Sequence, residues 1–326
     1  MRFTKTLLTT ALLGAFVFSF QSTAWAIEQS QIIQVEQLYK QKDFKAILAI
    51  IHPLAEQGDA LAQALVGDMY KEGLGVKQDD VEAVKWYRKA AEQGDADTQF
   101  NLGNMYYRGQ GVKQDYFEAV KWYRQAAEQG DAKAQLNLGN MYVKGLGVKQ
   151  DYVEAVKWFR KAAKQGDAKA QLNLGNMYAK GRGVKQDDFE AVKWYRQAAE
   201  QGYAQAQYNL GVMYYNGRGV KQDDFEAVKW YLKAAEQGDA DAQANLGSAY
   251  GAGRGVRQDY AEAVKWVKKA AENGSADGQF KLGLAYLIGL GIQKDRTFAK
   301  EWLGKACDNG EQRGCEYYGK LNRGEM

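Results

Sequence analysis

Residues Gly130–Gln165 read GDAKAQLNLGNMYVKGLGVKQDYVEAVKWFRKAAKQ, and this stretch decides the fold. In its first half, Ala134, Leu138, Met141 and Tyr142 recur at the spacing of one face of an α-helix. The first half therefore predicts a short amphipathic helix.

The glycine-rich loop in the middle of the stretch predicts a turn into a second helix. Gly145 and Gly147 end the first helix, because glycine tolerates the positive φ that is common after a helix C-terminus. Asp151, with Glu154 three residues later, is the pattern of a helix N-cap and its reciprocal capping partner. The second helix then presents a wide apolar face that mixes aromatic residues with alanines: Ala155, Trp158, Phe159, Ala162 and Ala163.

The same pattern returns every 36 residues along the chain. Seven full copies start at Gly58, Gly94, Gly130, Gly166, Gly202, Gly238 and Gly274, and a partial copy starts at Gly310. A motif repeated this often indicates an architectural unit rather than a series of active sites, because each copy must solve the same folding problem. We predict an all-α chain of about sixteen helices and no strand, two helices for each unit.

Ligand sites in the loops are not favoured. The loop GRGVKQDDF at Gly181 lacks the third glycine of a dinucleotide-binding fingerprint. The doubled acids in the loops have no further oxygen ligands at calcium-loop spacing: Asp79-Asp80, Asp187-Asp188 and Asp223-Asp224. We therefore expect no metal site and no cofactor.

The pattern A-x-A-Q-x-x-L-G-x-M-Y-x-x-G-x-G-V-x-x-D-x-x-x-A-x-x-W-Y-x-x-A-A-x-x-G resembles the Sel1-like repeat, a relative of the tetratricopeptide repeat. The resemblance implies a right-handed α-solenoid in which residues 58–309 form seven repeats and residues 310–326 form a partial C-terminal capping repeat. Residues 27–57 keep a possible helix pair, Gln31 to Gln41 and Phe44 to Ala55, but lack the glycine loop. We expect them to form an N-terminal cap.

The N-terminus predicts export. The basic start MRFTK precedes an apolar run, LLTTALLGAFVFSF, that is shorter than the ~20 residues of a membrane-spanning helix, and AWA at residues 24–26 is a small-x-small cleavage signal. We expect a signal peptide at residues 1–26 and a mature chain that starts near Ile27 without a membrane span. No cysteine lies at the cleavage point, so we expect a periplasmic or secreted protein without a lipid anchor.

Charge gives no sign of a nucleic-acid partner. The net charge is +4, and loss of residues 1–26 removes two basic residues and leaves +2.

Two cysteines, Cys307 and Cys315, lie eight residues apart. In an exported protein this pair indicates a disulfide, and two buried free thiols are the alternative. Cys307 replaces the second alanine of the AA pair, and Cys315 replaces the glutamine found at the same position as Gln279. The segment KACDNGEQRGCEYYG is similar to cysteine-rich secreted Sel1 proteins, and that resemblance implies a staple between consecutive helices.

A binding groove is expected on the first helix of each repeat. If Leu138, Met141 and Tyr142 face the core, positions 4, 7, 11 and 14 of each repeat cluster roughly opposite, and position 8 beside them is asparagine in five repeats. Equivalent positions line the concave groove of tetratricopeptide proteins, so the resemblance nominates them. Amide side chains suit the backbone of an extended peptide, and interleaved apolar side chains provide pockets or sugar-stacking faces. The predicted groove residues are Phe100, Asn101, Asn104, Tyr107, Leu136, Asn137, Asn140, Leu172, Asn173, Asn176, Tyr208, Asn209 and Tyr215.

The alternative for these asparagines is that duplication copied a solvated surface residue. A row of lysines on the second helices, beside acidic residues, is interpreted as a solvated face: Lys85, Lys121, Lys157, Lys193, Lys229 and Lys265.

We expect a non-catalytic scaffold that binds a protein segment, or a cell-wall glycan, along this groove. The alternatives are β-lactamase-like or penicillin-binding activity, which the resemblance to cysteine-rich Sel1 proteins allows, and a role in virulence through contact with a host. Serine chemistry of the β-lactamase kind needs S-x-x-K, and the serines beyond the signal peptide, Ser30, Ser248 and Ser275, lack it. The single histidine, His52, lies beside Pro53 and is interpreted as a packing residue.

Overall fold

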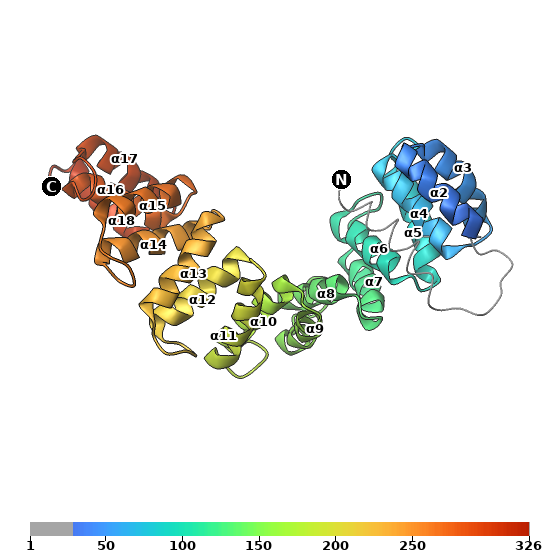
Figure 1. The fold of residues 1–326 in the computed structure, drawn as a ribbon, viewed down its shortest axis with the longest axis horizontal. Helices are drawn as coiled ribbons and strands as arrows, with labels where there is room; N and C mark the ends of the chain where they lie inside the picture. The colour runs from blue at the N-terminus through green and yellow to red at the C-terminus, as the bar shows by residue number, and fades with distance from the viewer. Residues whose placement is uncertain (1–28, 326) are drawn as a thin grey trace. The chain divides into compact units, whose positions relative to one another are not determined.

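The computed structural model describes residues 29–325, and every regular element in that range is an α-helix (Figure 1). The prediction of an all-helical chain without strands is confirmed for these residues, which form 17 helices. The predicted signal peptide at residues 1–26 lies outside the described range. The chain divides into two compact units, one that ends at Ala162 and one that begins at Ala163.

The first unit holds the N-terminal helix pair and the first three repeats, and its last helix runs past the boundary. Its helices are α2 (Gln29–Gln41), α3 (Phe44–Glu56), α4 (Ala60–Glu72), α5 (Asp80–Glu92), α6 (Ala96–Arg108), α7 (Tyr116–Glu128), α8 (Ala132–Lys144) and α9 (Tyr152–Lys164). Consecutive helices pack against one another, as expected for an α-solenoid of helix pairs. The predicted N-terminal pair is present as α2 and α3.

The second unit continues the same alternation. Its helices are α10 (Ala168–Lys180), α11 (Asp188–Glu200), α12 (Ala204–Asn216), α13 (Asp224–Glu236), α14 (Ala240–Ala252), α15 (Tyr260–Glu272), α16 (Ala276–Ile288), α17 (Arg296–Asp308) and α18 (Gln312–Asn322). The partial copy at Gly310 therefore supplies one helix, α18, which packs against α17.

The loop between the two helices of a repeat folds as its glycines and aspartate predict. Gly145 and Gly147 have φ of 67° and 66°. Asp151 Oδ1 accepts the backbone N–H of Glu154 at 2.9 Å, so the N-cap is formed. The reciprocal half of the predicted capping box is wrong: the backbone N–H of Asp151 donates to Tyr142 O at 3.0 Å, and the Glu154 carboxylate pairs with Lys157.

The core of each repeat lies between its two helices. Leu138 and Met141 on α8 are buried, as are Trp158 and Phe159 on α9. Gly139 allows the ring of Phe159 to lie against α8, because a Cβ there would stand 2.6 Å from Phe159 Cε1.

Buried glutamines join successive repeats, a feature that the sequence analysis did not identify. Gln135 is 3% exposed, and its Nε2 donates to Ala127 O at 3.0 Å, across the loop between two repeats. Gln129 Nε2 donates to Gly94 O at 2.9 Å and to Gln99 Oε1 at 2.8 Å, which ties the last residue of a repeat to the start of the same repeat. Because Gln99 and Gln135 are buried and each donates to a carbonyl of the preceding repeat, they help to fix the stacking of neighbouring repeats.

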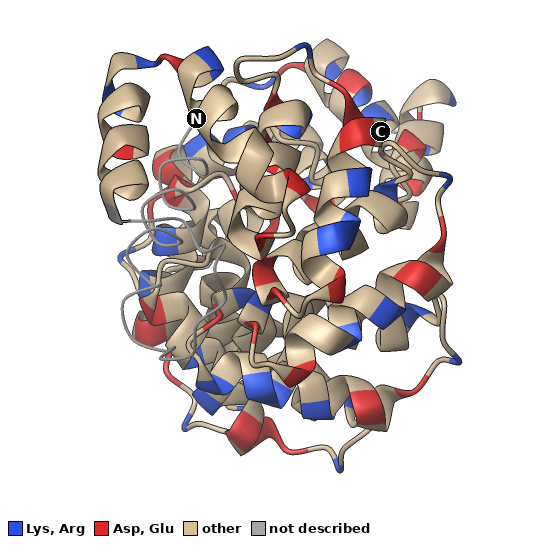
Figure 2. Ribbon diagram, turned by 90° about the vertical axis from the view of Figure 1, so that its right-hand side faces the viewer, with Lys and Arg blue, Asp and Glu red and all other residues tan. Residues whose placement is uncertain are grey.

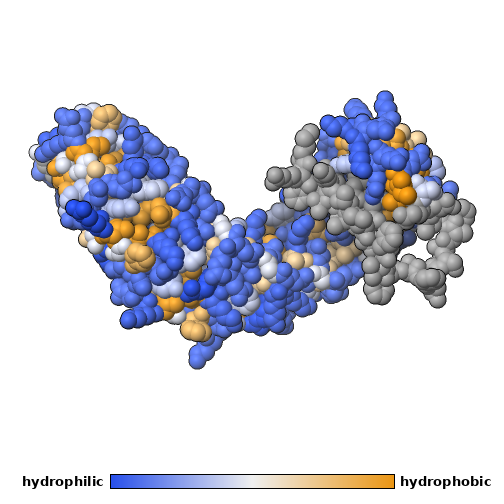
Figure 3. Space-filling model, viewed as in Figure 1, coloured by the Kyte–Doolittle hydropathy of each residue, from blue (hydrophilic) through white to orange (hydrophobic). Residues whose placement is uncertain are grey.

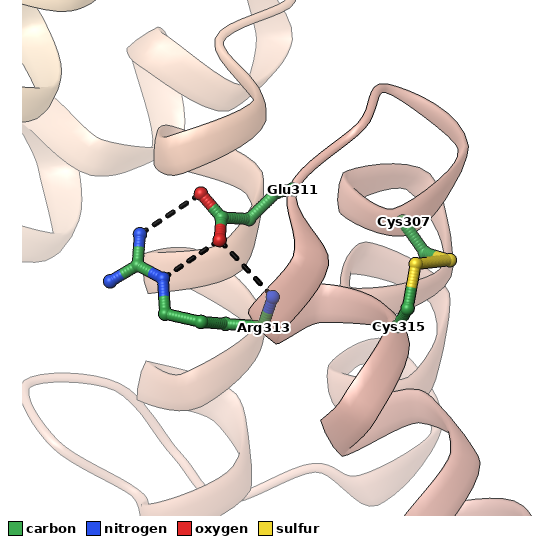
Figure 4. The surroundings of a disulfide bond; sticks show 4 residues. All are labelled: Cys307, Glu311, Arg313 and Cys315. Carbon is green, nitrogen blue, oxygen red and sulfur yellow. Dashed lines mark hydrogen bonds and ion pairs between the residues drawn. A yellow bond between two sulfur atoms is a disulfide. The ribbon is translucent and has the colours of Figure 1, made fainter.

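The C-terminal cysteines lie at disulfide-bonding distance. Cys307 near the end of α17 and Cys315 in α18 have sulfur atoms 1.95 Å apart (Figure 4). Beside them, Arg313 Nε donates to Glu311 Oε1 at 2.7 Å, and Arg313 also pairs with Asp277 of the preceding repeat at 2.9 Å. The disulfide and these ion pairs hold the last helix to the array.

Candidate functional site

A pocket of about 170 Å³ lies between the C-terminal halves of α6 and α8 in the first unit. It is lined by Asn104, Tyr107, Arg108, Tyr123, Asn137, Asn140, Met141 and Lys144. Four of these eight, Asn104, Tyr107, Asn137 and Asn140, are predicted groove residues. The structure thus brings side chains from two consecutive repeats together around one cavity.

Asn104 lies under the pocket and is held by the helix behind it. Its Oδ1 accepts the hydroxyl of Tyr123 on α7 at 2.8 Å and the Nδ2 of Asn137 on α8 at 3.4 Å. Burial raises the pKa of Tyr123, so its hydroxyl stays a neutral donor. Asn104 is therefore both a surface amide and the acceptor for a largely buried tyrosine.

The second unit repeats this arrangement. Asn176 Oδ1 accepts the hydroxyl of Tyr195 at 2.8 Å and the Nδ2 of Asn209 at 3.3 Å. Burial raises the pKa of Tyr195 to about 12. The network of tyrosine hydroxyl and two asparagines is thus a recurrent feature of these repeats.

The first repeat carries a carboxyl group at the same position. Asp68 accepts the hydroxyl of Tyr87 and lines a small apolar pocket, of about 20 Å³, together with Phe44 and Ile47. Burial raises the pKa of Asp68 to about 6, against the lowering effect of the Tyr87 hydrogen bond.

Position 7 of the repeat does not form the open apolar pockets that were predicted. Leu136 and Leu172 are each only 8% exposed and belong to the core, because the side chain at this position points toward the neighbouring helices. Phe100 and Tyr208 are half-buried, and their rings pack against Tyr123 and Tyr231 with centroids 6.0 Å apart. The remaining predicted residues, Asn101, Asn173 and Tyr215, are half-buried on their first helices.

Two cations stand at the rim of the pocket. Arg108 ends α6 and Lys144 ends α8, and both side chains are exposed. Within residues 29–325, neither forms an ion pair, and no acidic residue lines the pocket. Elsewhere basic and acidic residues are interspersed along the helices, as Figure 2 shows.

The row of lysines on the second helices has the partners that were expected. Lys121, Lys157 and Lys193 each pair with a glutamate three residues earlier, at 3.6, 2.8 and 3.1 Å. These exposed pairs stabilise little and satisfy the charges locally.

The asparagine at position 11 does not extend to the C-terminal repeats. After Asn176, position 11 becomes Val212, Ser248 and Leu284. Figure 3 shows apolar atoms gathered over α14 and α16, where Ile288 is 63% exposed.

A second apolar surface was missed by the sequence analysis. The residue after the first residue of each second helix is exposed and often aromatic: Phe117 is 76% exposed, Phe189 71% and Phe225 69%. The sequence indicates this surface through a large apolar residue that recurs directly before the repeated segment EAVKW. That residue lies at a helix position that faces away from the core.

The residues considered for catalysis have structural partners. Ser248 Oγ donates to Ala244 O at 3.0 Å, and Ser275 Oγ accepts the backbone N–H of Gly278 as the N-cap of α16. The ring of His52 packs edge-on against Trp86 at 5.4 Å. Over the described part of the chain, no three His, Cys, Asp or Glu side chains gather in a way that would hold a metal ion. None of the helices described is both long and apolar enough for a membrane span.

Comparison with known proteins identifies the repeats. The Sel1 repeat family matches residues 60–95, 96–131, 132–167, 168–203, 204–239, 240–275 and 276–311. A protective antigen of uropathogenic Escherichia coli strains, which displays an SLR fold, is 36% identical, with a TM-score of 0.85, over 96% of this chain and 67% of that chain. A Sel1 repeat protein from Oxalobacter formigenes is 33% identical, with a TM-score of 0.71, over 95% of this chain and 99% of that chain. The comparison with curated proteins gave no match.

Proposed function

The chain belongs to the Sel1 repeat family, and we propose that it is an exported, non-catalytic scaffold that binds an extended protein segment at the asparagine-lined surface of its first helices. Sel1 repeats form solenoids that generally serve as protein-interaction scaffolds. The observation that carries the proposal is the pocket between α6 and α8, whose walls are amides from two successive repeats.

The chemistry of this surface suits a peptide backbone. An amide side chain offers one acceptor and two donors, which match the carbonyl and N–H groups of an extended segment. Tyr123 and Tyr195 hold Asn104 and Asn176 through their Oδ1 atoms, so the Nδ2 groups point in a fixed direction. A fixed donor binds with less loss of side-chain entropy than a mobile one.

The proposal includes export, because a disulfide between Cys307 and Cys315 suits an oxidising compartment. N-terminal sequencing of the protein from periplasmic and culture-medium fractions tests this. We expect a mature chain that begins near Ile27, and an intact Met1 in the cytoplasmic fraction would contradict it.

The binding proposal is tested by selecting peptides from a displayed library of random dodecapeptides on the oxidised mature protein. Selected peptides are then measured against Asn137→Ala/Asn140→Ala, because both side chains line the pocket. We expect binding to weaken about tenfold in this variant. The control variant Lys121→Ala/Lys157→Ala, on the second helices of the same repeats, should bind within about twofold of wild type.

Two results would overturn the proposal. One is the absence of any enriched peptide together with binding of purified cell-wall glycan, which would make a glycan the ligand. The other is loss of binding in the lysine variant, or in Phe117→Ser, with the asparagine variant unaffected, which would place the binding surface on the second helices.

Contact with a host is a second candidate setting, and the similarity to a protective antigen of uropathogenic strains favours it. Labelling of intact cells with antibodies against the mature protein tests exposure to a host. Labelling only after permeabilisation would favour a periplasmic role.

A further inference from the structure

We propose that the pocket between α6 and α8 binds the carboxylate of an acidic side chain, so that the segment bound by this protein carries Asp or Glu. The inference rests on the proposed function and specifies the partner's chemistry. Its basis is the pair of cations, Arg108 and Lys144, at the rim of a cavity whose walls are neutral amides and tyrosine hydroxyls.

The two cations have no acidic partner in the part of the chain described. Lys121 and Lys157, on the second helices of the same repeats, each pair with a glutamate one turn away. The acidic N-caps of α6 and α8, Asp95 and Asp131, lie at the opposite ends of 13-residue helices, about 20 Å away at 1.5 Å per residue. No acidic side chain lines the pocket, so its lining residues carry a net positive charge.

Complementing the helix dipole does not account for these cations. Lys and Arg are favourable in the last turn of a helix. The helices α12, α14 and α16 have the same length and the same glycine C-cap, yet end in Asn216, Ala252 and Ile288. The fold thus forms this helix end without a cation.

The helix-end carbonyls do not cancel the positive potential either. Tyr107 O accepts Gln114 Nε2 and Val143 O accepts Gln150 Nε2, both at 2.8 Å. The carbonyls one residue earlier, of Tyr106 and Tyr142, accept backbone N–H groups at 3.0 Å. Because these oxygens are engaged, an anion at the pocket meets the two cations and the amide donors rather than bare carbonyls.

The sequence couples the cation to the asparagine. Asn104 precedes Arg108 by four residues, as Asn140 precedes Lys144 and Asn176 precedes Lys180, which puts each pair on one helix face. In the next repeat both positions change: Val212 replaces the asparagine, and Asn216 replaces the cation. Duplication alone would have kept the two positions alike in every repeat, so their joint change points to one ligand group that uses both.

Carboxylate recognition predicts the composition of the peptides that the library yields. Wild-type protein should enrich dodecapeptides with internal Asp or Glu. A selected peptide, synthesised with an amidated C-terminus, should lose about tenfold in affinity when its acidic residue is changed to Gln or Asn. An amidated peptide that loses affinity while its free acid regains it would place the chain-terminal carboxylate, not the side chain, in the pocket and overturn the proposal.

The matching protein variant is Arg108→Glu/Lys144→Glu. We expect this variant to bind the acidic peptide about tenfold more weakly than wild type does. It should bind a peptide whose acidic residue is changed to Lys better than wild type does. The matched control is Lys113→Glu/Lys149→Glu, two exposed loop lysines of the same repeats that make the same change in net charge. It should bind the acidic peptide within about twofold of wild type.

The outcomes separate this inference from the proposed function. One outcome is a peptide that binds more weakly to Asn137→Ala/Asn140→Ala, yet binds wild type equally well when its acidic residue is changed to Gln. That result would support the proposed function and overturn the carboxylate site. Equal losses in the two glutamate variants would show an effect of net charge alone and overturn it as well. Thermal melting followed by circular dichroism confirms that each variant is folded before binding is scored.

Discussion

Gln279 and Cys315 occupy the same position of consecutive repeats, and each is bonded to the residue eight positions before it. Gln279 Nε2 donates to Ala271 O at 3.3 Å, whereas Cys315 is bonded through sulfur to Cys307. The Gln279 side chain is also held by the last residue of its own repeat, since Asn309 Nδ2 donates to its Oε1 at 2.8 Å. No second helix follows α18 in the described chain, so Cys315 has no counterpart of Asn309 beside it, and a covalent bond takes the place of the hydrogen-bonded ladder at this end.

This relationship predicts the effect of restoring the common residues. The variant Cys307→Ala/Cys315→Gln recreates the pair found in the other repeats but removes the cross-link. We expect the C-terminal end to lose about 2 kcal/mol, because the short loop is no longer closed in the unfolded chain. Hydrogen exchange of α18 amides measures it.

Reduction provides the control for that variant. Dithiothreitol should speed exchange in α18 of wild type and leave the double variant unchanged. If α18 keeps its protection in the variant, the ladder alone holds the last helix and the cross-link is dispensable.

A second prediction concerns Asn104. Substitutions of surface residues usually change stability little, but Asn104 and Asn176 are exceptions, because their Oδ1 atoms accept the hydroxyls of Tyr123 and Tyr195. Asn104→Ala should cost about 1–2 kcal/mol, since a largely buried hydroxyl loses its acceptor.

A double-mutant cycle isolates this hydrogen bond. Tyr123→Phe combined with Asn104→Ala should cost less than the sum of the two single changes. Asn140→Ala is the matched control, because Phe159 stands where Tyr123 does and carries no hydroxyl. Additive effects in urea denaturation would contradict the coupling.

These residues also mark how far the sequence predicts the structure. The helix bounds, the glycine turns, the Asp151 cap and the buried face follow from local spacing, which the sequence displays directly. The burial of Leu136 depends on helices from neighbouring repeats, and the role of Asn104 depends on a tyrosine 19 residues away. Contacts of this kind are set by how repeats stack, which helical periodicity alone does not encode.

The third prediction tests that stacking at a glycine. Gly111 has φ of +66°, and a Cβ there would lie 2.1 Å from Asp80 O on the second helix of the preceding repeat. Gly130 also has positive φ, +104°, but a Cβ there meets nothing within 4 Å. Gly111→Ala should therefore destabilise the first unit by more than ~3 kcal/mol, and Gly130→Ala by about 1 kcal/mol from backbone strain alone.

Urea denaturation followed by far-ultraviolet circular dichroism measures both variants. Equal losses would mean that strain at positive φ, and not the close approach of repeats, accounts for the glycine at Gly111.

The last prediction concerns pH and Asp68. Burial raises the pKa of this carboxyl from 3.8 to about 6 in the folded protein, so the folded chain binds a proton that the unfolded chain has released between those values. The contribution of Asp68 to stability is therefore fully present below about pH 4 and is lost as the pH rises through 6. From pH 4 to 7 the loss is at most about 3 kcal/mol, from a shift of about two pKa units at 1.36 kcal/mol each. Asp68→Asn should remove this dependence, because a neutral amide can accept the Tyr87 hydroxyl as Asn104 accepts that of Tyr123.

Urea denaturation of wild type and variant at pH 4, 5, 6 and 7 isolates the contribution of the carboxyl to stability as the difference between the two curves. The variant should be the more stable protein at pH 7. Asn104→Asp is the reciprocal variant, and it should introduce a pH dependence of the same sign in α6. Parallel curves for wild type and Asp68→Asn across this range would mean that Asp68 is ionised in the folded protein at no cost, and that its burial against Phe44 and Ile47 does not set its pKa.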